Sequence, residues 1–297
     1  MINLNYLQKD VDISNLSNFK TKAFTKLYFE ISSRQDVDKI SEIVEYAKNE
    51  KLKILFIGGG TNLLFAFDIF NGIIIKNCLQ GWDYDNDTKI LTAYSSEKIW
   101  EIAKTLENDY GQNIWHRFIG LPGSIGGAVF GNAGCFGLET EGNFKEAEVL
   151  DLSTGKIEVM DKEKVKFSYR NSIFKETNKY FIISIKFDLN EKKEKYSSDV
   201  DNIDFRENKQ PKGNSGGSFF KNPSKELSAG KAIEEVGLKG YRHNDAFFSE
   251  KHANFLINSK ENGSWQDLIY LIDLAKEKIK DKFGIELEPE VRIIYNT

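Results

Sequence analysis

The sequence KILFIGGGTNLL at residues 53–64 decides which nucleotide-binding folds this chain can adopt. Residues 53–57 carry an apolar run, Ile-Leu-Phe-Ile at 54–57, and predict a short strand that runs directly into three glycines. A dinucleotide-binding Rossmann fold needs a third glycine at position 63 opening a helix, but that residue is Leu63. A Walker loop is excluded because no Gly-Lys-Ser/Thr follows. Residues 58–62 therefore predict either a simple tight turn or a nest of main-chain N–H groups that binds a phosphate.

A second glycine-rich stretch reads GLPGSIGGA at residues 120–128 and continues as NAGCFG at residues 132–137. Glycine inside regular structure costs about 0.5–1 kcal/mol relative to alanine, so this density favours a close approach of the main chain to a ligand. A glycine-rich connection between sheets is the alternative.

Helical spacing indicates two helices, one before the first glycine segment and one after it. Ser33, with Asp36 three residues later, predicts the start of one helix. Residues 97–108 predict the other. The apolar positions that carry the two patterns are Val37, Ile40, Val44 and Ala47, and then Ile99, Ile102, Ala103 and Leu106.

Residues 147–187 predict β structure, with a turn at 153–156 and alternating apolar residues from Phe181 to Phe187. The charged segment 190–214 predicts a domain boundary. A mixed α/β lobe follows. Its long helix is expected to be capped by Ser264 and stopped by Gly284, and a closing strand is expected from Val291 to Tyr295.

Composition excludes several classes of function. The chain has 297 residues, 40% of them hydrophobic, which is enough for a large core divided into two or three lobes. A net charge of −4 gives no basic footprint for nucleic acid. The absence of a long apolar run and of a signal-like start favours a soluble cytoplasmic protein with no membrane partner. Two cysteines and three histidines, none at metal-ligand spacing, argue against a metal site, so redox or other demanding chemistry would need an organic cofactor.

Three polar segments are candidates for a site. They are GGSFFKNP at residues 216–223, Tyr169-Arg170, and Glu290-Val291-Arg292. Ser218 has no neighbouring histidine, which argues against a catalytic triad. Each segment also has a structural interpretation: Ser218 as the cap of a turn, Arg170 as a surface ion-pair partner, and Glu290 as an exposed residue of a terminal strand.

Seven motifs together resemble the UDP-N-acetylenolpyruvoylglucosamine reductase family. They stand in the family's order, span nearly the whole chain, and read GGGTNLL at 58–64, LPGSIGGA at 121–128, NAG at 132–134, YRNS at 169–172, GSFFKNP at 217–223, SEKHANF at 249–255 and EPEVR at 288–292. The length is similar to that of the shorter, second type of this enzyme. The chain departs from the family pattern at residues 93–97, 115–116 and 243–245.

The resemblance implies an α+β fold. Two lobes of the vanillyl-alcohol-oxidase (PCMH) type would hold FAD, and a C-terminal α/β lobe would bind the substrate. On this sequence the lobes are expected at residues 1–76 and 77–190, with a linker at 191–214 and the C-terminal domain at 215–297.

The resemblance also implies a reaction in which NADPH, through FAD, reduces the enolpyruvyl group of UDP-N-acetylglucosamine enolpyruvate to UDP-N-acetylmuramate, a precursor of bacterial peptidoglycan. Ser218 would supply the proton, Arg170 would stabilise the charge that develops on the substrate carboxylate, and Glu290 would be protonated and donate a hydrogen bond. The alternatives are another FAD oxidase or dehydrogenase of the same fold, acting on a different sugar or alcohol, and a non-catalytic protein that binds FAD or a sugar nucleotide.

The resemblance implies binding residues as well. FAD would be held non-covalently. The first histidine of the chain is His116, so the first glycine segment has no histidine that could form a covalent link. The protein is expected to be a monomer with a UDP-sugar substrate. The expected FAD contacts are Gly58, Gly59, Gly60, Thr61, Asn62, Leu63, Pro122, Gly123, Ser124, Gly126, Gly127, Ala128, Asn132 and Gly134. The expected substrate or nicotinamide contacts are Tyr169, Lys221, Asn222 and His252.

Overall fold

The computed structural model describes residues 4–190 and 203–296, and these residues form two compact units. The first unit comprises Met1–Gln8, Tyr28–Gly59 and Gly72–Arg206, and the second comprises Lys9–Leu27, Gly60–Asn71 and Glu207–Thr297. The last crossing between the units falls inside the expected linker, of which residues 191–202 lie outside the described part. The finer division at 1–76, 77–190 and 215–297 stays a prediction.

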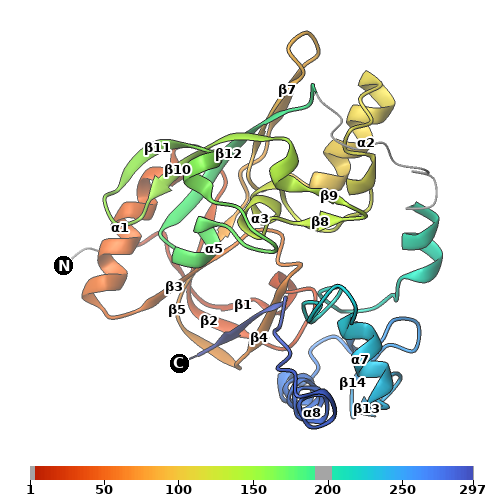
Figure 1. Cartoon of the computed structure of the whole chain (residues 1–297). Coiled ribbons are helices and arrows are strands. Elements are labelled where there is room, and N and C mark those ends of the chain that lie inside the picture. Colours follow the sequence, from red (N-terminus) through yellow and green to blue (C-terminus); the bar gives the residue numbers. More distant parts are fainter. Residues whose placement is uncertain (1–3, 191–202, 297) are drawn as a thin grey trace. The chain divides into compact units, whose positions relative to one another are not determined.

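The first unit is centred on a five-stranded antiparallel sheet with the strand order β11-β10-β12-β7-β6 (Figure 1). Helix α3 packs against β7 and β12, α5 packs against β12, and α4 packs against β10 and β11. The bounds are β6 Trp82–Asp85, β7 Ile90–Tyr94, β10 Phe144–Asp151, β11 Lys156–Asp161, β12 Tyr180–Asp188, α2 Ile99–Tyr110, α3 Ile125–Phe130, α4 Lys162–Val165 and α5 Ile173–Thr177.

Trp115 marks the centre of this unit's core. Its ring meets those of Phe118 and Phe187 edge-on, with centroids 5.5 and 4.7 Å away. Aromatic pairs in this geometry add to the stabilisation that burial provides. Short 3₁₀ turns η2 (His116–Phe118) and η3 (Thr140–Gly142) and the two-residue strands β8 (Gly134–Cys135) and β9 (Leu138–Glu139) complete this region.

A four-stranded sheet has the order β1-β2-β5-β3, and the division between the units falls inside its first three strands. Strand β3 runs parallel to β5, and α1 packs against β3. The bounds are β1 Gln8–Asp12, β2 Phe24–Ile31, β3 Lys53–Ile57, β5 Ile69–Asn77 and α1 Asp36–Asn49, with the 3₁₀ turn η1 at Ser14–Leu16.

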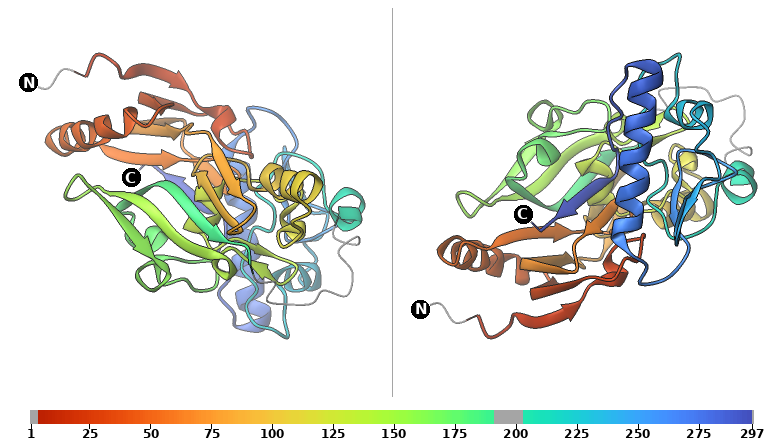
Figure 2. Two further views of the ribbon diagram at one scale, coloured as in Figure 1. Left: turned by 90° about the horizontal axis from the view of Figure 1, so that it is seen from above. Right: turned by 90° about the horizontal axis from the view of Figure 1, so that it is seen from below.

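The second unit is organised around α8 (Trp265–Phe283), the long helix at the blue end of the colour scale in Figure 2. This helix packs against α7, against β4 and against all three strands of a small antiparallel sheet, β13-β14-β15. Strand β16 pairs in parallel with β4. The bounds are β4 Leu63–Ala66, α7 Ala229–Glu235, β13 Arg242–His243, β14 Ala246–Phe248, β15 Leu256–Asn258 and β16 Arg292–Tyr295; a π-helical turn, η4, spans Phe205–Lys209.

Several local predictions are confirmed. Residues 53–57 form β3, and residues 63–66 form a strand and not a helix, which agrees with the exclusion of the Rossmann pattern. Helix α2 buries all four of its predicted apolar positions. Helix α8 is capped by the Ser264 hydroxyl, which accepts from the Gln266 N–H, and it ends at Gly284 with φ 68°.

Two local predictions are wrong in part. The first helix begins at Asp36 because the main-chain N–H and the hydroxyl of Ser33 both donate to the Asp36 carboxylate, which closes a turn before the helix. Ile43 takes the buried position expected for Val44. The region 147–187 is not purely β, since α4 and α5 interrupt it between β11 and β12.

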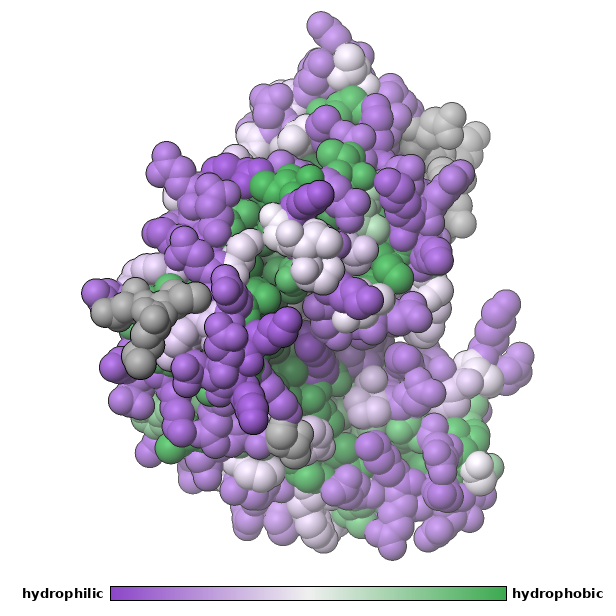
Figure 3. Space-filling view, turned by 90° about the vertical axis from the view of Figure 1, so that its left-hand side faces the viewer, coloured by the Kyte–Doolittle hydropathy of each residue, from purple (hydrophilic) through white to green (hydrophobic). Residues whose placement is uncertain are grey.

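Polar side chains are interspersed with small apolar patches on the face drawn in Figure 3. No helix among the described residues is long and apolar enough to span a membrane. Residues 4–190 and 203–296 also contain no group of three or more histidine, cysteine, aspartate or glutamate side chains arranged to hold a metal ion.

Candidate functional site

The two glycine-rich segments of the first unit meet main chain to main chain. A Cβ atom added to Gly59 would lie 3.3 Å from the main-chain nitrogen of Ser124 and 3.4 Å from the Cα of Gly123. A Cβ atom on Gly58 would lie 2.8 Å from the Ser124 hydroxyl. A side chain at position 59 would therefore press on the main chain of the second segment, and one at position 58 would displace the Ser124 hydroxyl, so glycine suits both positions.

This contact gathers main-chain donors. Across residues 4–190 and 203–296, no protein acceptor receives a hydrogen bond from the main-chain N–H groups of Gly59, Gly123 or Ser124. Unpaired N–H groups that share one surface form a binding site for an anion such as a phosphate. The residues present thus fit the diphosphate of the cofactor that the sequence predicts.

Helix α3 holds the second glycine segment in place. The Ser124 hydroxyl accepts from the Gly127 N–H and caps the helix. Gly126 is buried against Ser95, where a Cβ atom would lie 2.7 Å from the Ser95 Cβ and 2.9 Å from its carbonyl oxygen. Ala128 is also buried, whereas Pro122 and Gly127 are exposed. Gly126 and Ala128 therefore pack the helix against the sheet, and Pro122 and Gly127 face outward.

Residues 60–63 belong to the second unit. Gly60 has φ 70°, and a Cβ atom there would lie 2.0 Å from the Leu16 carbonyl oxygen, so no other residue fits. The Asn62 side chain donates to the Glu290 carbonyl over 3.1 Å, and the Asn62 carbonyl accepts from the Arg292 N–H. Thr61 is half-buried, and Leu63 pairs with Arg292 at the start of β4.

Arg170 lies in the first unit beside residues 132–134, where the second glycine-rich stretch continues. Its guanidinium donates to the Gly134 carbonyl over 2.8 Å and to the Asn132 carbonyl over 3.5 Å, and it lies 5.0 Å from the centre of the exposed Tyr169 ring. Arg170 has φ 56°, a left-handed conformation that costs free energy for a residue with a side chain. Strain of this kind is common at functional positions and makes Arg170 a site candidate on structural grounds.

Ser218 and Glu290 are brought together in the second unit. Ser218 forms an isolated antiparallel bridge with Phe255, and the Phe219 carbonyl accepts from the Glu290 N–H over 2.7 Å. Within the described residues the Ser218 hydroxyl has no hydrogen-bond partner, so it does not cap the turn as its structural interpretation requires. Both side chains are half-buried.

The remaining predicted contacts have structural partners. The Lys221 ammonium donates to the Glu288 carboxylate over 2.9 Å, and the Asn222 side-chain oxygen accepts from the Ala229 N–H at the start of α7. His252 accepts, through Nδ1, from the Asn254 N–H over 3.2 Å. Burial lowers the pKa of His252 below its ordinary value, which favours the neutral ring.

Two residues that matter for these segments were missed at the sequence level. The buried Asn254 side chain accepts from the Phe220 N–H over 2.9 Å and donates to the Phe220 carbonyl over 2.8 Å, which fixes the main chain two residues from Ser218. The Lys76 ammonium donates to the Gly58 carbonyl. Asn254 lies inside the SEKHANF motif, and its place in that motif could have marked it as a candidate. Nothing in the sequence around Lys76 indicates that its partner is Gly58.

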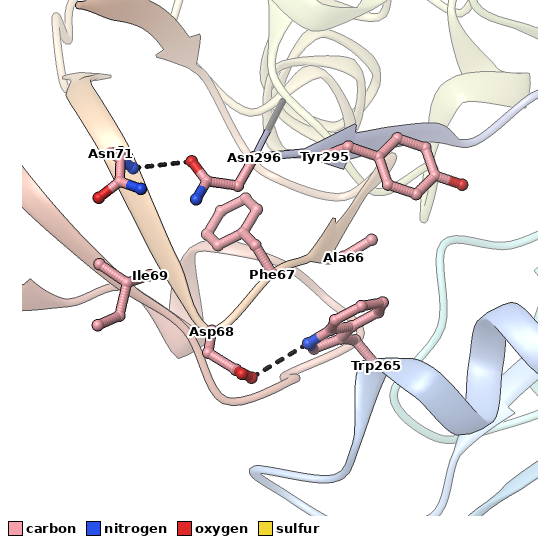
Figure 4. A pocket seen from close by; sticks show the side chains of 8 residues that line it. All are labelled: Ala66, Phe67, Asp68, Ile69, Asn71, Trp265, Tyr295 and Asn296. Carbon is pink, nitrogen blue, oxygen red and sulfur yellow. Dashed lines mark hydrogen bonds between the residues drawn. The ribbon is translucent and has the colours of Figure 1, made fainter.

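A shallow cavity of about 520 Å³ lies elsewhere in the second unit and contains none of the predicted site residues (Figure 4). Hydrogen bonds link Trp265 to Asp68 and Asn71 to Asn296 across it. It is lined by Ala66, Phe67, Asp68, Ile69, Asn71, Trp265, Tyr295 and Asn296.

Comparisons with known protein families match two separate parts of the chain. The sequence model described as "FAD binding domain" matches residues 33–161, and the one described as "UDP-N-acetylenolpyruvoylglucosamine reductase, C-terminal domain" matches residues 209–294. The predicted α+β class, an FAD-binding domain of the vanillyl-alcohol-oxidase type with a C-terminal domain of this reductase, is therefore confirmed.

Whole-chain relatives point the same way. The chain is 32% identical to UDP-N-acetylenolpyruvoylglucosamine reductase of Aquifex aeolicus over 290 residues, which covers 96% of this chain and 94% of the relative. It is 35% identical to reductase 2 of Bacillus anthracis over 261 residues, 86% of this chain and 83% of the relative. The crystal structure of the reductase (MurB) from Thermus caldophilus matches with a TM-score of 0.76 and 22% identity, over 98% of this chain and 100% of that one, which shows a shared fold.

Proposed function

The chain belongs to the UDP-N-acetylenolpyruvoylglucosamine reductase family, and on this premise we propose which residues carry its reaction. It is an FAD-dependent oxidoreductase of peptidoglycan precursor synthesis. The substrate is the enolpyruvyl ether of UDP-N-acetylglucosamine, the product is UDP-N-acetylmuramate, and NADPH is the co-substrate. We place the enzyme in the cytoplasm as a monomer.

FAD supplies, when bound, the transfer of a hydride from NADPH to the terminal carbon of the enolpyruvyl double bond. The N–H groups of Gly59, Gly123 and Ser124 would hold its diphosphate, because they belong to one unit and donate to no acceptor in the described part of the chain. The other predicted FAD contacts lie on the same segments or directly beside them.

Ser218 donates the proton that completes the reduction. Hydride addition leaves negative charge on the carbon next to the carboxylate, and that carbon must be protonated. The observation that carries this assignment is the Ser218 hydroxyl, which has no hydrogen-bond partner among residues 4–190 and 203–296. Beside it, the main-chain bond from the Glu290 N–H to the Phe219 carbonyl brings a residue with a carboxyl group to the same segment. A protonated Glu290 can donate a hydrogen bond to the charge that forms on the substrate.

Arg170 binds the substrate carboxylate. Its guanidinium is permanently charged and can donate two parallel hydrogen bonds to a carboxylate. The Gly134 and Asn132 carbonyls hold its two terminal nitrogens, which orients the group before substrate binds. Tyr169, Lys221, Asn222 and His252 are proposed as further contacts to substrate or nicotinamide.

An anaerobic titration in two steps tests the proposal. NADPH is added to the purified, FAD-loaded protein, and the loss of the oxidised flavin spectrum is recorded. The enolpyruvyl substrate is then added. Rapid return of the oxidised spectrum is expected; bleaching without recovery would point to another electron acceptor, and protein unable to take up FAD would refute the function altogether.

A further inference from the structure

Lys76, on strand β5, connects this strand to the first glycine segment. It stands opposite Ile57 in the pairing of β3 with β5, at the point where β3 ends and the glycines begin. Its ammonium donates to the Gly58 carbonyl. All of these residues belong to the first unit.

Peptide geometry gives this bond a consequence for Gly59. The Gly58 carbonyl and the Gly59 N–H belong to one peptide group, and the described residues contain no cis peptide bond. In a planar trans peptide the C=O and N–H bonds point in opposite directions. A lysine that holds the Gly58 oxygen on one side therefore turns the Gly59 N–H to the other side.

Gly59 also lies against the second glycine segment. Gly59 packs against Gly123 and the main-chain nitrogen of Ser124, and its own N–H has no partner among residues 4–190 and 203–296. Two glycines in sequence can adopt many peptide orientations, so without an external contact the Gly58–Gly59 peptide would be free to flip. Lys76 removes that freedom.

The charge of Lys76 adds to the effect. A hydrogen bond to a carbonyl polarises the peptide and strengthens the donor at its N–H end. The ammonium is half-buried, near Glu30 and Cys78, and burial lowers its pKa. In the described part of the chain the ammonium donates to no other group, so the Gly58 carbonyl, together with the nearby charge of Glu30, compensates the cation for the water it has lost.

We propose that Lys76 is a positioning residue for the cofactor diphosphate: it orients the Gly58–Gly59 peptide so that the Gly59 N–H joins those of Gly123 and Ser124. This inference rests on the proposed function, because FAD is taken as the ligand. Lys76 acts through the main chain and is not itself expected to contact the diphosphate.

The test compares two ligands of the apoprotein. FAD carries the diphosphate, and riboflavin has the same ring system without any phosphate. Dissociation constants for both are measured by flavin fluorescence with wild-type protein, Lys76→Met and Lys76→Arg. Lys53→Met is the matched control, since Lys53 is an exposed lysine on the neighbouring strand β3. Thermal melting of each apoprotein is recorded in parallel.

Lys76→Met is expected to bind FAD about ten- to a hundredfold more weakly, the loss typical of one charge-assisted hydrogen bond, and to bind riboflavin as wild type does. Lys76→Arg, which keeps a charged donor, is expected to recover most of the preference for FAD over riboflavin. Lys53→Met should behave as wild type.

Three results would overturn the inference. Unchanged FAD affinity in Lys76→Met would show that the peptide needs no anchor. An equal loss for FAD and riboflavin, with a lower melting temperature, would assign Lys76 to the fold alone. If Lys76→Met does not fold, the test falls to Lys76→Arg. A Lys76→Arg protein that folds but no longer binds FAD more tightly than riboflavin would also overturn the inference. Wild-type protein that binds riboflavin but not FAD would refute the proposed function itself.

Discussion

Main-chain groups make the candidate phosphate site of the first unit, whereas the side chains of Ser218 and Glu290, on main chains that are hydrogen-bonded to each other's neighbours, make the candidate site of the second. A Cβ atom on Gly59 would lie only 3.3–3.4 Å from main-chain atoms of Ser124 and Gly123, and one on Gly58 would lie 2.8 Å from the Ser124 hydroxyl. Ser218 and Glu290, by contrast, project from segments already joined through the Phe219 carbonyl. Adding one carbon should therefore damage the first site, and removing a side chain should disable the second without unfolding it.

The largest effect is expected from Ser218→Ala. The variant keeps the Phe219–Glu290 main-chain bond, so its FAD content and melting temperature should match those of wild type. Its reoxidation by the enolpyruvyl substrate should slow by about 10²–10⁴-fold, the usual contribution of a proton donor, while bleaching by NADPH stays unchanged. Stopped-flow absorbance measures both steps. Ser224→Ala, in the exposed loop nearby, is the control; equal slowing of both steps would remove Ser218 from the role of proton donor.

Gly126→Ala tests whether one added carbon disturbs the close packing of the first unit. The new Cβ would lie 2.7 Å from that of Ser95 and 2.9 Å from the Ser95 carbonyl, so α3 must shift from the sheet. Such overpacking lowers the free energy of unfolding by about 2–3 kcal/mol and should weaken FAD binding with it. Urea unfolding measures the change. Gly131→Ala is the control, since a Cβ there has its nearest neighbour at 3.7 Å; if the two variants were equally stable, the close contact at Gly126 would not matter.

Asn254→Ala tests whether the second site depends on its main-chain support. The substitution leaves the buried N–H and carbonyl of Phe220 without their side-chain partners, which should cost about 2 kcal/mol of unfolding free energy. Substrate-dependent reoxidation should slow as well, because Ser218 lies two residues away. Chemical denaturation and stopped-flow absorbance are the measurements. Asn86→Ala on an exposed turn serves as control, and full activity in Asn254→Ala would show that Ser218 needs no such clamp.

The smallest effect is a pH dependence from His252. Because burial depresses its folded-state pKa, the unfolded chain binds the proton more readily than the folded one does. The stabilisation is complete above the ordinary pKa of 6.5 and is lost as the pH falls through the lower folded value. Protonation also removes the Nδ1 acceptor of the Asn254 N–H. Urea unfolding from pH 8 to pH 5 should show a shallower decline in His252→Gln; parallel profiles would contradict the assignment.

Local sequence patterns predicted the parts of the fold that depend on near neighbours. The Ser264 cap, the Gly284 stop and the apolar spacing between them predicted α8, because a helix end is satisfied by residues within one turn. The same reasoning misplaced the start of α1 by treating Ser33 as its cap, since the pairing of Ser33 with Asp36 is compatible with a turn as well as with a helix.

Motif order predicted the family and hence the list of candidate residues. It did not indicate which structural contacts those residues make. Asn222 accepts from the first residue of α7, and Asn62 bonds the main chain of Glu290 and Arg292, although both had been expected only as ligand contacts. A motif records which residues occur together and leaves their hydrogen bonds open.

The sequence by itself determined the class of fold, the family, and the strand and helices whose patterns are local. Tertiary structure alone decided that the Phe219 carbonyl receives the Glu290 N–H, that Asn254 fixes Phe220, and that Lys76 reaches the Gly58 carbonyl. The physical reason is that the partners lie far apart in the sequence, so the packing of each unit, and not any short stretch of sequence, sets which of them meet.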